Sequence, residues 1–306
     1  MIKLCVNNET ATLKSVILGI ATSNGPSPTA AEAYDPKSLE HIRKGSYPVE
    51  QDMTYEMDCF EQVLEKYDVE IIRPHLIPNY NQIFTRDIGF VIADYFIKAN
   101  ILPDRAHEWE AIQFVIDQID PQKFIAPPPE VHIEGGDVIL WNEYILVGTY
   151  KGTDYASYNT ARTNMDGVSF LRTHFPDRMV KEFDLIKSST DPRANALHLD
   201  CCFQPLGRDK AIILKEGFRD PADYAFLVQL FGQDKLFHIT SEEMYHMYSN
   251  VFSINSETIV SEQKFTRLNN WLRGHKFHVE AVPYAEIGKQ EGLLRCSTLP
   301  LFRQDD

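Results

Sequence analysis

Apolar residues recur along the first quarter of the chain in patterns that predict a strand, a helix and a second strand. A short apolar run at residues 14–20 has the length and composition of a strand. In residues 50–66, apolar side chains recur every three or four positions, which is the spacing of one helix face. Residues 69–73 form another short apolar run, which Pro74 ends.

Four later segments each hold two apolar runs around a short polar turn, which is the pattern of a β-hairpin. These segments are residues 88–100, 137–148, 202–215 and 251–262. Helical patterns follow them at residues 108–118, 159–175, 221–231 and 261–275. A hairpin and helix repeated about every 50 residues indicates a closed, pseudo-symmetric array, in which the N-terminal unit would be the fifth. A plain mixed α/β sheet with hairpins is the alternative.

Two stretches do not fit this repeat. Residues 24–48 are rich in Pro, Ser and Ala. Long irregular segments are often functional, so we expect either a flap near a site or a surface insertion. The chain then ends in a predicted strand at residues 278–282, a loop that contains Cys296, and a solvated tail near Arg303. Because no linker divides the chain, we expect a single domain over residues 1–306.

Composition and charge restrict the partners. The 306 residues are 43% hydrophobic and carry a net charge of −14. This balance argues against nucleic-acid binding, which needs a basic face, whereas an acidic pocket favours a cationic ligand. No apolar run approaches the roughly 18 residues of a membrane helix, so we expect no membrane contact. The five cysteines are odd in number and lack metal-site spacing, which predicts a reduced, cytoplasmic protein.

Residues that can do chemistry stand just before the predicted hairpins. Asp87 precedes the first hairpin, Glu134 the second, and His198 and Asp200 the third, while Cys296 follows the last predicted strand. In a closed array of repeats, equivalent ends converge on the axis. We therefore expect these side chains to meet in one central pocket.

This set suits a planar cation with many N–H donors, because carboxylates can accept those donors in pairs. A thiolate at Cys296 could attack the central carbon while His198 delivers a proton to the leaving amine. Glu134 could orient His198 as the third member of a triad does. We expect the neighbouring Arg295 to lower the pKa of the thiol toward neutrality.

Simpler interpretations exist for several of these residues. Asp87 could pair with Arg86 or cap a turn, and His198 could be a hydrogen-bonded core histidine. The sequence also offers a metal site, although without tight ligand spacing, from His132, Glu134, Asp137 and His198. We therefore expect no metal and no other cofactor.

Four motifs together resemble the guanidine-modifying superfamily of arginine deiminases, dimethylarginine dimethylaminohydrolases and amidinotransferases. They are FTRD at 84–87, EGGDVI at 134–139, HLD at 198–200 with a following CF, and RCSTLP at 295–300. The resemblance implies a five-bladed α/β-propeller of pseudo-symmetric ββαβ repeats. It also implies Cys296 as the nucleophile that forms a covalent amidino-thioether, His198 as general acid and base, Glu134 as its partner, and Asp87 as the residue that grips the guanidinium.

The resemblance points to more than one subfamily. Asp200 matches the second guanidinium-binding carboxylate of arginine deiminases and amidinotransferases, whereas the stretch around Cys296 looks like the hydrolases. Residues 160–164 resemble a hydrolase segment whose arginine, here Arg162, binds the substrate carboxylate. We expect a hydrolase of arginine or a related guanidino compound, with a homo-oligomer left open. An amidinotransferase that passes the amidino group to an amine is the alternative. A non-catalytic binder is a third, against which the intact Cys296, His198 and Glu134 set argues.

Overall fold

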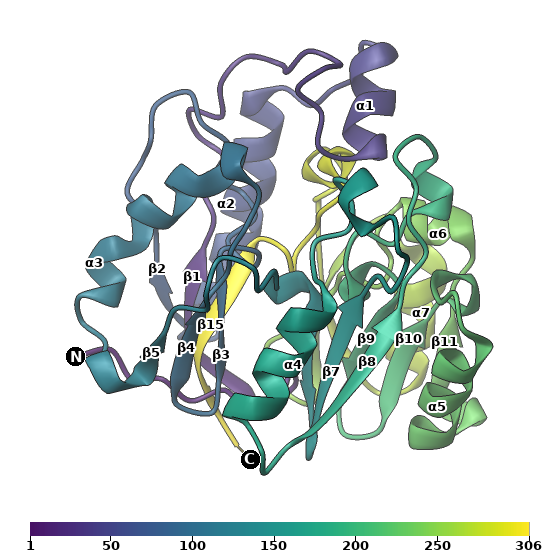
Figure 1. Ribbon diagram of the computed structural model, residues 1–306. Helices are drawn as coiled ribbons and strands as arrows, with labels where there is room; N and C mark the ends of the chain where they lie inside the picture. The colour runs from purple at the N-terminus through teal and green to yellow at the C-terminus, as the bar shows by residue number, and fades with distance from the viewer. Residues whose placement is uncertain (306) are drawn as a thin grey trace.

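Five separate sheets of three strands each form the framework of the protein (Figure 1). The computed structural model describes residues 1–305. The sheets are β15–β1–β2 (Thr298–Gln304, Thr12–Leu18, Glu70–Ile72), β3–β4–β5 (Gly89–Ile92, Tyr95–Lys98, Phe124–Ile125), β6–β7–β8 (Val138–Trp141, Tyr144–Thr149, Met179–Asp184), β9–β10–β11 (Phe203–Leu206, Lys210–Ile213, Leu236–His238) and β12–β13–β14 (Phe252–Ser253, Thr258–Glu262, His278–Val282). In every sheet the middle strand is antiparallel to the first and parallel to the third.

A helical segment leads from the middle strand of each sheet to the parallel third strand. The α-helices are α1 (Pro36–Arg43), α2 (Glu50–Lys66), α3 (Gln113–Ile116), α4 (Met165–His174), α5 (Pro221–Phe231), α6 (Ser241–Tyr245) and α7 (Thr266–Gly274). Each sheet with its helix is one ββαβ unit, so the predicted fivefold repeat is confirmed. The alternative of one mixed sheet is wrong, because the strands pair within five small sheets.

The N-terminal sheet is completed by a strand from the other end of the sequence. β15 (yellow in Figure 1) pairs antiparallel with β1 (purple). The sequence did not predict β15, and the expected solvated tail near Arg303 is wrong. Arg303 is 1% exposed and donates hydrogen bonds to the carbonyl oxygens of Ala11, at 2.6 Å, and Ser253, at 2.9 Å. Pairing with β1 carries this side chain into the interior.

Several predicted helices differ from the observed ones at their ends. The helix expected at 108–118 is mainly a 3₁₀ helix (Pro103–Ile112) followed by the short α3. α4 begins later than predicted because the Asn164 side chain caps it by accepting from the Gly167 amide at 2.9 Å. The irregular segment 24–48 contains α1, which Asp35 caps by accepting from the Ser38 amide at 2.7 Å.

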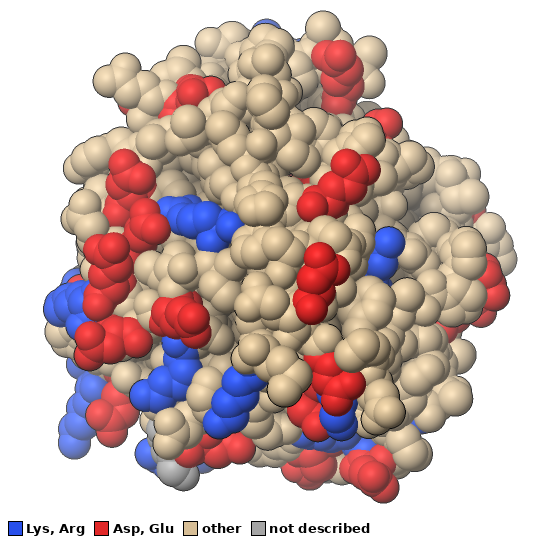
Figure 2. Space-filling view, turned by 90° about the vertical axis from the view of Figure 1, so that its left-hand side faces the viewer, with Lys and Arg blue, Asp and Glu red and all other residues tan. Residues whose placement is uncertain are grey.

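The charged side chains and the helices bear on the expectations drawn from composition. On the face shown in Figure 2, acidic and basic side chains are interspersed. Within residues 1–305, none of the helices combines the length and apolar character needed to cross a bilayer. The charged residues that the sequence places in a site are buried: Asp87, Glu134, His198 and Asp200.

Candidate active site

A cavity of about 530 Å³ brings the predicted residues to one place. Asp87, Arg162, His198 and Cys296 all line it. The segment 24–48 contributes much of the remaining wall, including the side chains of Tyr34 and Tyr47. This segment is therefore a flap beside the site, and the alternative of a remote surface insertion is wrong.

The repeat explains why residues far apart in sequence meet here. Asp87 stands two residues before β3, Glu134 four before β6, His198 five before β9, and Cys296 two before β15. Each of these strands is the antiparallel outer strand of its own sheet. Equivalent ends of four units thus supply the side chains of one cavity.

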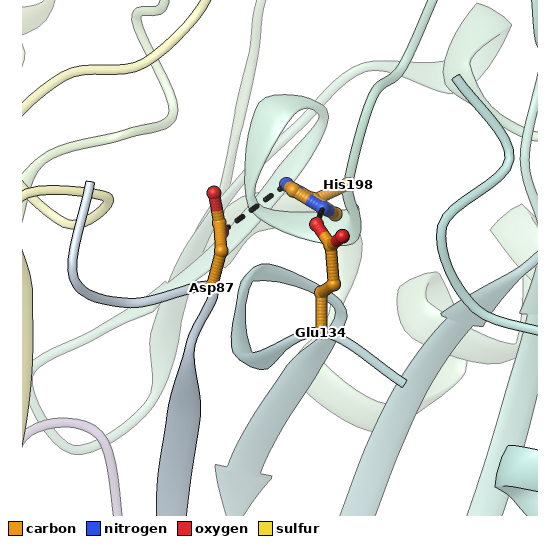
Figure 3. A group of neighbouring side chains, drawn as sticks. All are labelled: Asp87, Glu134 and His198. Atoms are coloured by element: carbon orange, nitrogen blue, oxygen red, sulfur yellow. Dashed lines mark hydrogen bonds and ion pairs between the residues drawn. The ribbon is translucent and has the colours of Figure 1, made fainter. Parts of the chain in front are cut away.

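His198 lies between two carboxylates (Figure 3). Its Nε2 is 2.8 Å from Oε2 of Glu134, and its Nδ1 is 3.7 Å from Oδ1 of Asp87. Burial opposes the charged imidazole, but Asp87 and Glu134 outweigh it and raise the pKa of His198 to about 9. Burial also opposes ionisation of Glu134, yet Arg162 and His198 lower its pKa to about 2. At neutral pH the pair is an imidazolium and a carboxylate.

The two glycines of the EGGD motif are required by close packing at this point. A Cβ on Gly136 would lie 2.6 Å from Nδ1 of His198. A Cβ on Gly135 would lie 2.1 Å from the carbonyl oxygen of Arg86. Larger residues would displace the imidazole or the backbone that leads to Asp87.

Asp87 pairs with Arg105 and not with Arg86. Nη1 of Arg105 lies 2.7 Å from Oδ2 of Asp87, and its Nε lies 2.6 Å from Oε1 of Glu108. Oδ1 of Asp87 is buried without a hydrogen-bond partner. Arg86 instead donates to Oγ1 of Thr298 at 3.3 Å. The sequence analysis did not identify Arg105 and Glu108. Their spacing of three residues, which allows an ion pair on one helix face, was the signal that could have indicated them.

Asp200 is placed beside the cysteine but behind the cavity wall. Its Oδ2 is 3.7 Å from Sγ of Cys296 and 2.8 Å from Nη1 of Arg295. The guanidinium of Arg295 also donates to Glu9, from Nη2 to Oε1 at 2.9 Å and from Nε to Oε2 at 3.2 Å. A buried chain of acid, arginine and acid therefore fixes the Asp200 carboxylate next to the thiol.

The expected shift of the Cys296 pKa toward neutrality is wrong, although Arg295 itself acts in the expected direction. Burial, followed by the negative charges of Asp200 and Asp87, raises the pKa of Cys296 well above its ordinary value. Arg295 opposes this only weakly because Glu9 and Asp200 already hold its charge. The charges of the protein itself therefore favour the protonated thiol.

Arg162 lies in the cavity wall beside the His198 pair. Its Nη1 is 3.3 Å from Oε2 of Glu134, and its Nε donates to the carbonyl oxygen of Asn159 at 2.5 Å. The side chain of Arg162 is almost fully buried. It precedes α4, with residues 155–157 forming a 3₁₀ turn just upstream.

Asn250 was missed by the sequence reasoning. Its Nδ2 lies 3.1 Å from Sγ of Cys296, and its Oδ1 accepts from the amide of Cys296 at 3.1 Å. It stands two residues before β12, in the position that Asp87 has before β3. That position, just before the hairpin predicted at 251–262, was the available signal.

The residues that could hold a metal differ from those that the sequence suggested. Asp87, Glu134 and His198 each offer a ligand atom within 4.8 Å of the others, whereas His132 and Asp137 are not in this group. Asp87 is already paired with Arg105, and Glu134 contacts Arg162 and His198. A divalent cation would have to compete with these charges, so the geometry suits an organic cation better.

Five ββαβ units around a cavity with a cysteine, a histidine and buried carboxylates define a member of the guanidine-modifying superfamily. Residues 30–303 match the model of the eukaryotic N,N-dimethylarginine dimethylhydrolase family. The chain belongs to this family.

Known relatives include proteins with different activities. The uncharacterized protein YkgA of Bacillus subtilis (strain 168) is 28% identical over 250 residues, which cover 79% of this chain and 77% of YkgA. The N-terminal domain of ArgZ, an arginine dihydrolase from cyanobacteria, has a similar structure with a TM-score of 0.76 and 17% identity, covering 94% of this chain and 97% of that one. The inosamine-phosphate amidinotransferase StrB1 from Streptomyces griseus has a TM-score of 0.77 and 14% identity, covering 100% of this chain and 98% of that one. Likeness at these identities concerns the fold.

Proposed function

We propose that the protein hydrolyses the guanidino group of arginine or a related compound through a covalent amidino-thioether on Cys296. The observation that carries this proposal is one cavity lined by Cys296, Asp87 and His198, in which Oδ1 of Asp87 has no hydrogen-bond partner and His198 is hydrogen-bonded to the buried Glu134. ArgZ, which has a similar structure, is an arginine dihydrolase, and this supports a hydrolytic reaction. In this proposal residues 1–306 act as a single catalytic domain.

The charges around the cavity favour a cationic substrate. Oδ1 of Asp87 can accept an N–H of a guanidinium, and the Asp200 carboxylate lies beside the thiol. A bound guanidinium would offset the two negative charges that keep Cys296 protonated. The thiolate would then form only when its target carbon is in place. Arg162, on the cavity wall, is assigned to the carboxylate of the substrate.

The first half of the reaction makes the thioether. Sγ of Cys296 bonds to the central carbon of the guanidinium, and the bond from that carbon to one nitrogen breaks. His198, held as imidazolium by Glu134, protonates the departing nitrogen, and the thiol proton replaces the proton that His198 gave. Ammonia or an alkylamine leaves, and the amidino group keeps the positive charge.

The second half of the reaction uses water. After the first half, the His198 imidazolium gives its proton to the departed ammonia or amine, which leaves as the ammonium ion. The neutral ring then removes a proton from water as the water oxygen attacks the thioether carbon, the carbon–sulfur bond breaks, and the sulfur takes the remaining hydroxyl proton. The products are a ureido compound, the restored thiol and the restored imidazolium of His198. Glu134 keeps the imidazole in the orientation that both proton transfers need.

Product analysis without an added amine tests the proposal. The panel holds arginine, methylated arginines, agmatine and guanidino acids, with Cys296→Ala as the control. A ureido product together with ammonia or an alkylamine is the expected result, and the thioether should appear by mass spectrometry as an adduct on the peptide that contains Cys296.

Two other outcomes would reject hydrolysis. Product that appears only when glycine or another amine is supplied would establish an amidinotransferase. Binding of guanidino compounds without turnover under either condition would indicate a non-catalytic binder. A non-catalytic binder would also be indicated if a haloacetamidine labels Cys296 no faster than it labels a free thiol and if arginine does not slow the labelling.

A further inference from the structure

The five ββαβ units supply equivalent positions to the site, and the unit of β12 places Asn250 there. Asp87 stands two residues before β3, Cys296 two before β15, and Asn250 two before β12. Asn250 is fully buried and does not line the cavity. Its side chain faces the same central region from behind the cysteine.

Three contacts fix the orientation of the Asn250 amide. Oδ1 accepts from the backbone amides of Cys296 at 3.1 Å and Leu293 at 3.2 Å. Because both of these partners are donors, the oxygen must face them, and the NH₂ group must face the other way. Nδ2 then lies 3.1 Å from Sγ of Cys296. The backbone oxygen of Asn250 also accepts from the amide of Arg295 at 3.3 Å.

The thiol has few sources of positive potential in its surroundings. The Asp200 carboxylate lies 3.7 Å from Sγ, and the charge of Asp87 also acts on it. The nearby guanidinium of Arg295 is held by Glu9 and Asp200. A donor aimed at the sulfur therefore matters more here than it would in a positively charged site.

We propose that Asn250 is a further catalytic residue, whose side-chain amide donates a hydrogen bond to Sγ of Cys296 and stabilises the thiolate. This inference rests on the proposed function, in which Cys296 is the nucleophile. The same side chain holds the backbone of residues 293–296, so that the sulfur and its donor are positioned by one group.

The Asn250→Asp substitution tests the N–H donor independently of the contacts that the side-chain oxygen makes with the backbone. The variant keeps an oxygen for the amides of Cys296 and Leu293 but replaces the N–H donor with a second oxygen. A hydrogen bond to a charged group contributes about 1.5–3 kcal/mol, so the thiolate fraction should fall about 10- to 100-fold. Alkylation of Cys296 by neutral iodoacetamide, followed across pH, measures that fraction without any turnover.

The expected result is a rate at pH 7 that falls about 10- to 100-fold, with the midpoint of the pH profile moved upward. The matched control is Asn269→Asp, which changes an equally buried amide that donates to the carbonyl oxygen of Glu262 at 2.9 Å. The control should alkylate at the wild-type rate. Circular dichroism and thermal unfolding show that each variant is folded.

Asn250→Ala gives a second test, because it removes the donor without adding a charge. A slow rate in both variants supports the proposal. A rate and midpoint within about twofold of wild type in Asn250→Asp would overturn it, even if Asn250→Ala is slow, because the side chain would then act only by holding the loop. Since alkylation does not depend on substrate, a wild-type protein that hydrolyses no guanidino compound would reject the proposed function and leave this result readable.

Discussion

At the scale of single residues, each of the two candidate guanidinium-binding carboxylates forms an ion pair with an arginine through one of its oxygens. Arg105 holds Oδ2 of Asp87 at 2.7 Å, and Arg295 holds Oδ2 of Asp200 at 2.8 Å. Such pairs fix the orientation of a buried carboxylate before a substrate arrives. They also occupy one oxygen of each carboxylate, so Asp87 offers its single free Oδ1 to a ligand.

Replacing Asp87 by Asn should weaken guanidinium binding about 10- to 100-fold, because a charge-assisted hydrogen bond becomes a neutral one. Isothermal titration on a Cys296→Ala background measures binding without turnover. Asp94→Asn is the control, since that carboxylate is about half exposed, pairs with Lys123 and lies outside the cavity lining. Equal affinities for the two variants would remove Asp87 from the substrate contacts.

The His198 pair should make stability depend on pH. Because the folded pKa is raised from 6.5 to about 9, the stabilisation is complete below pH 6.5 and is lost as the pH rises through 9. The shift corresponds to about 3 kcal/mol. Urea unfolding at pH 6 and pH 9.5 should therefore show a larger loss for wild type than for His198→Gln. Parallel losses in the two proteins would contradict the assignment.

At the scale of elements, α2 fixes the segment that leads to the cysteine. Glu56 of α2 accepts from the backbone amides of Glu286, at 2.9 Å, and Ile287, at 2.8 Å. These amides stand at the start of a 3₁₀ helix (Ile287–Gln290), a few residues before Cys296. A helix of the first unit thus holds the backbone that leads to the cysteine loop.

Glu56 should also make the free energy of unfolding depend on pH. Burial raises the pKa of this carboxyl from 4.5 to about 7, although the two amides oppose the change. The folded state therefore holds a proton that the unfolded state has lost between these values, and stability falls as the pH rises from 4.5 through 7. The loss amounts to about 3 kcal/mol at most. In Glu56→Gln the free energy of unfolding should change less between pH 5 and pH 8; an unchanged slope would refute this.

The sequence predicts the elements whose signal is local. The hairpins, α2, α5 and β14 follow from apolar runs, turns and helical periodicity within each segment. β15 was missed because its partner, β1, lies at the other end of the sequence, and β5 because two residues leave no pattern. Similarly, α1 was hidden in a Pro-rich stretch, where Pro36 begins the helix rather than ending it.

The site residues likewise divide into those that a local sequence pattern indicates and those that only the folded structure reveals. Asp87, Glu134, His198 and Cys296 could be predicted because each stands at a repeated position before a strand. Arg105 and Asn250 could not be assigned, since their roles depend on which atoms they face in the folded protein. The predicted shift of the Cys296 pKa also had the wrong direction. Arg295 is adjacent to Cys296 in the sequence, but its guanidinium is paired with Glu9 and Asp200, which only the folded structure shows.

At the scale of the whole molecule, buried side chains join neighbouring units. Arg303 of β15 reaches the carbonyl oxygens of Ala11, before β1, and Ser253 of β12. Arg303→Met should lower the free energy of unfolding by about 2–4 kcal/mol, because it leaves two buried acceptors unpaired. Thermal unfolding measures this, with the exposed Arg273→Met on α7 as the control. Similar melting temperatures for the two variants would show that the contacts of Arg303 do not join the units.

The pairing of β15 with β1 also bears on how the active protein is made. Cys296 is followed closely by β15, whereas β1 is translated long before both of them. A chain that stops just after Cys296, or that a protease cleaves between Cys296 and β15, keeps the cysteine but lacks the strand that anchors its loop on the far side. Fragments of that kind should carry an ordinary, unpositioned thiol, so that reactivity appears only in chains that have been translated past this strand.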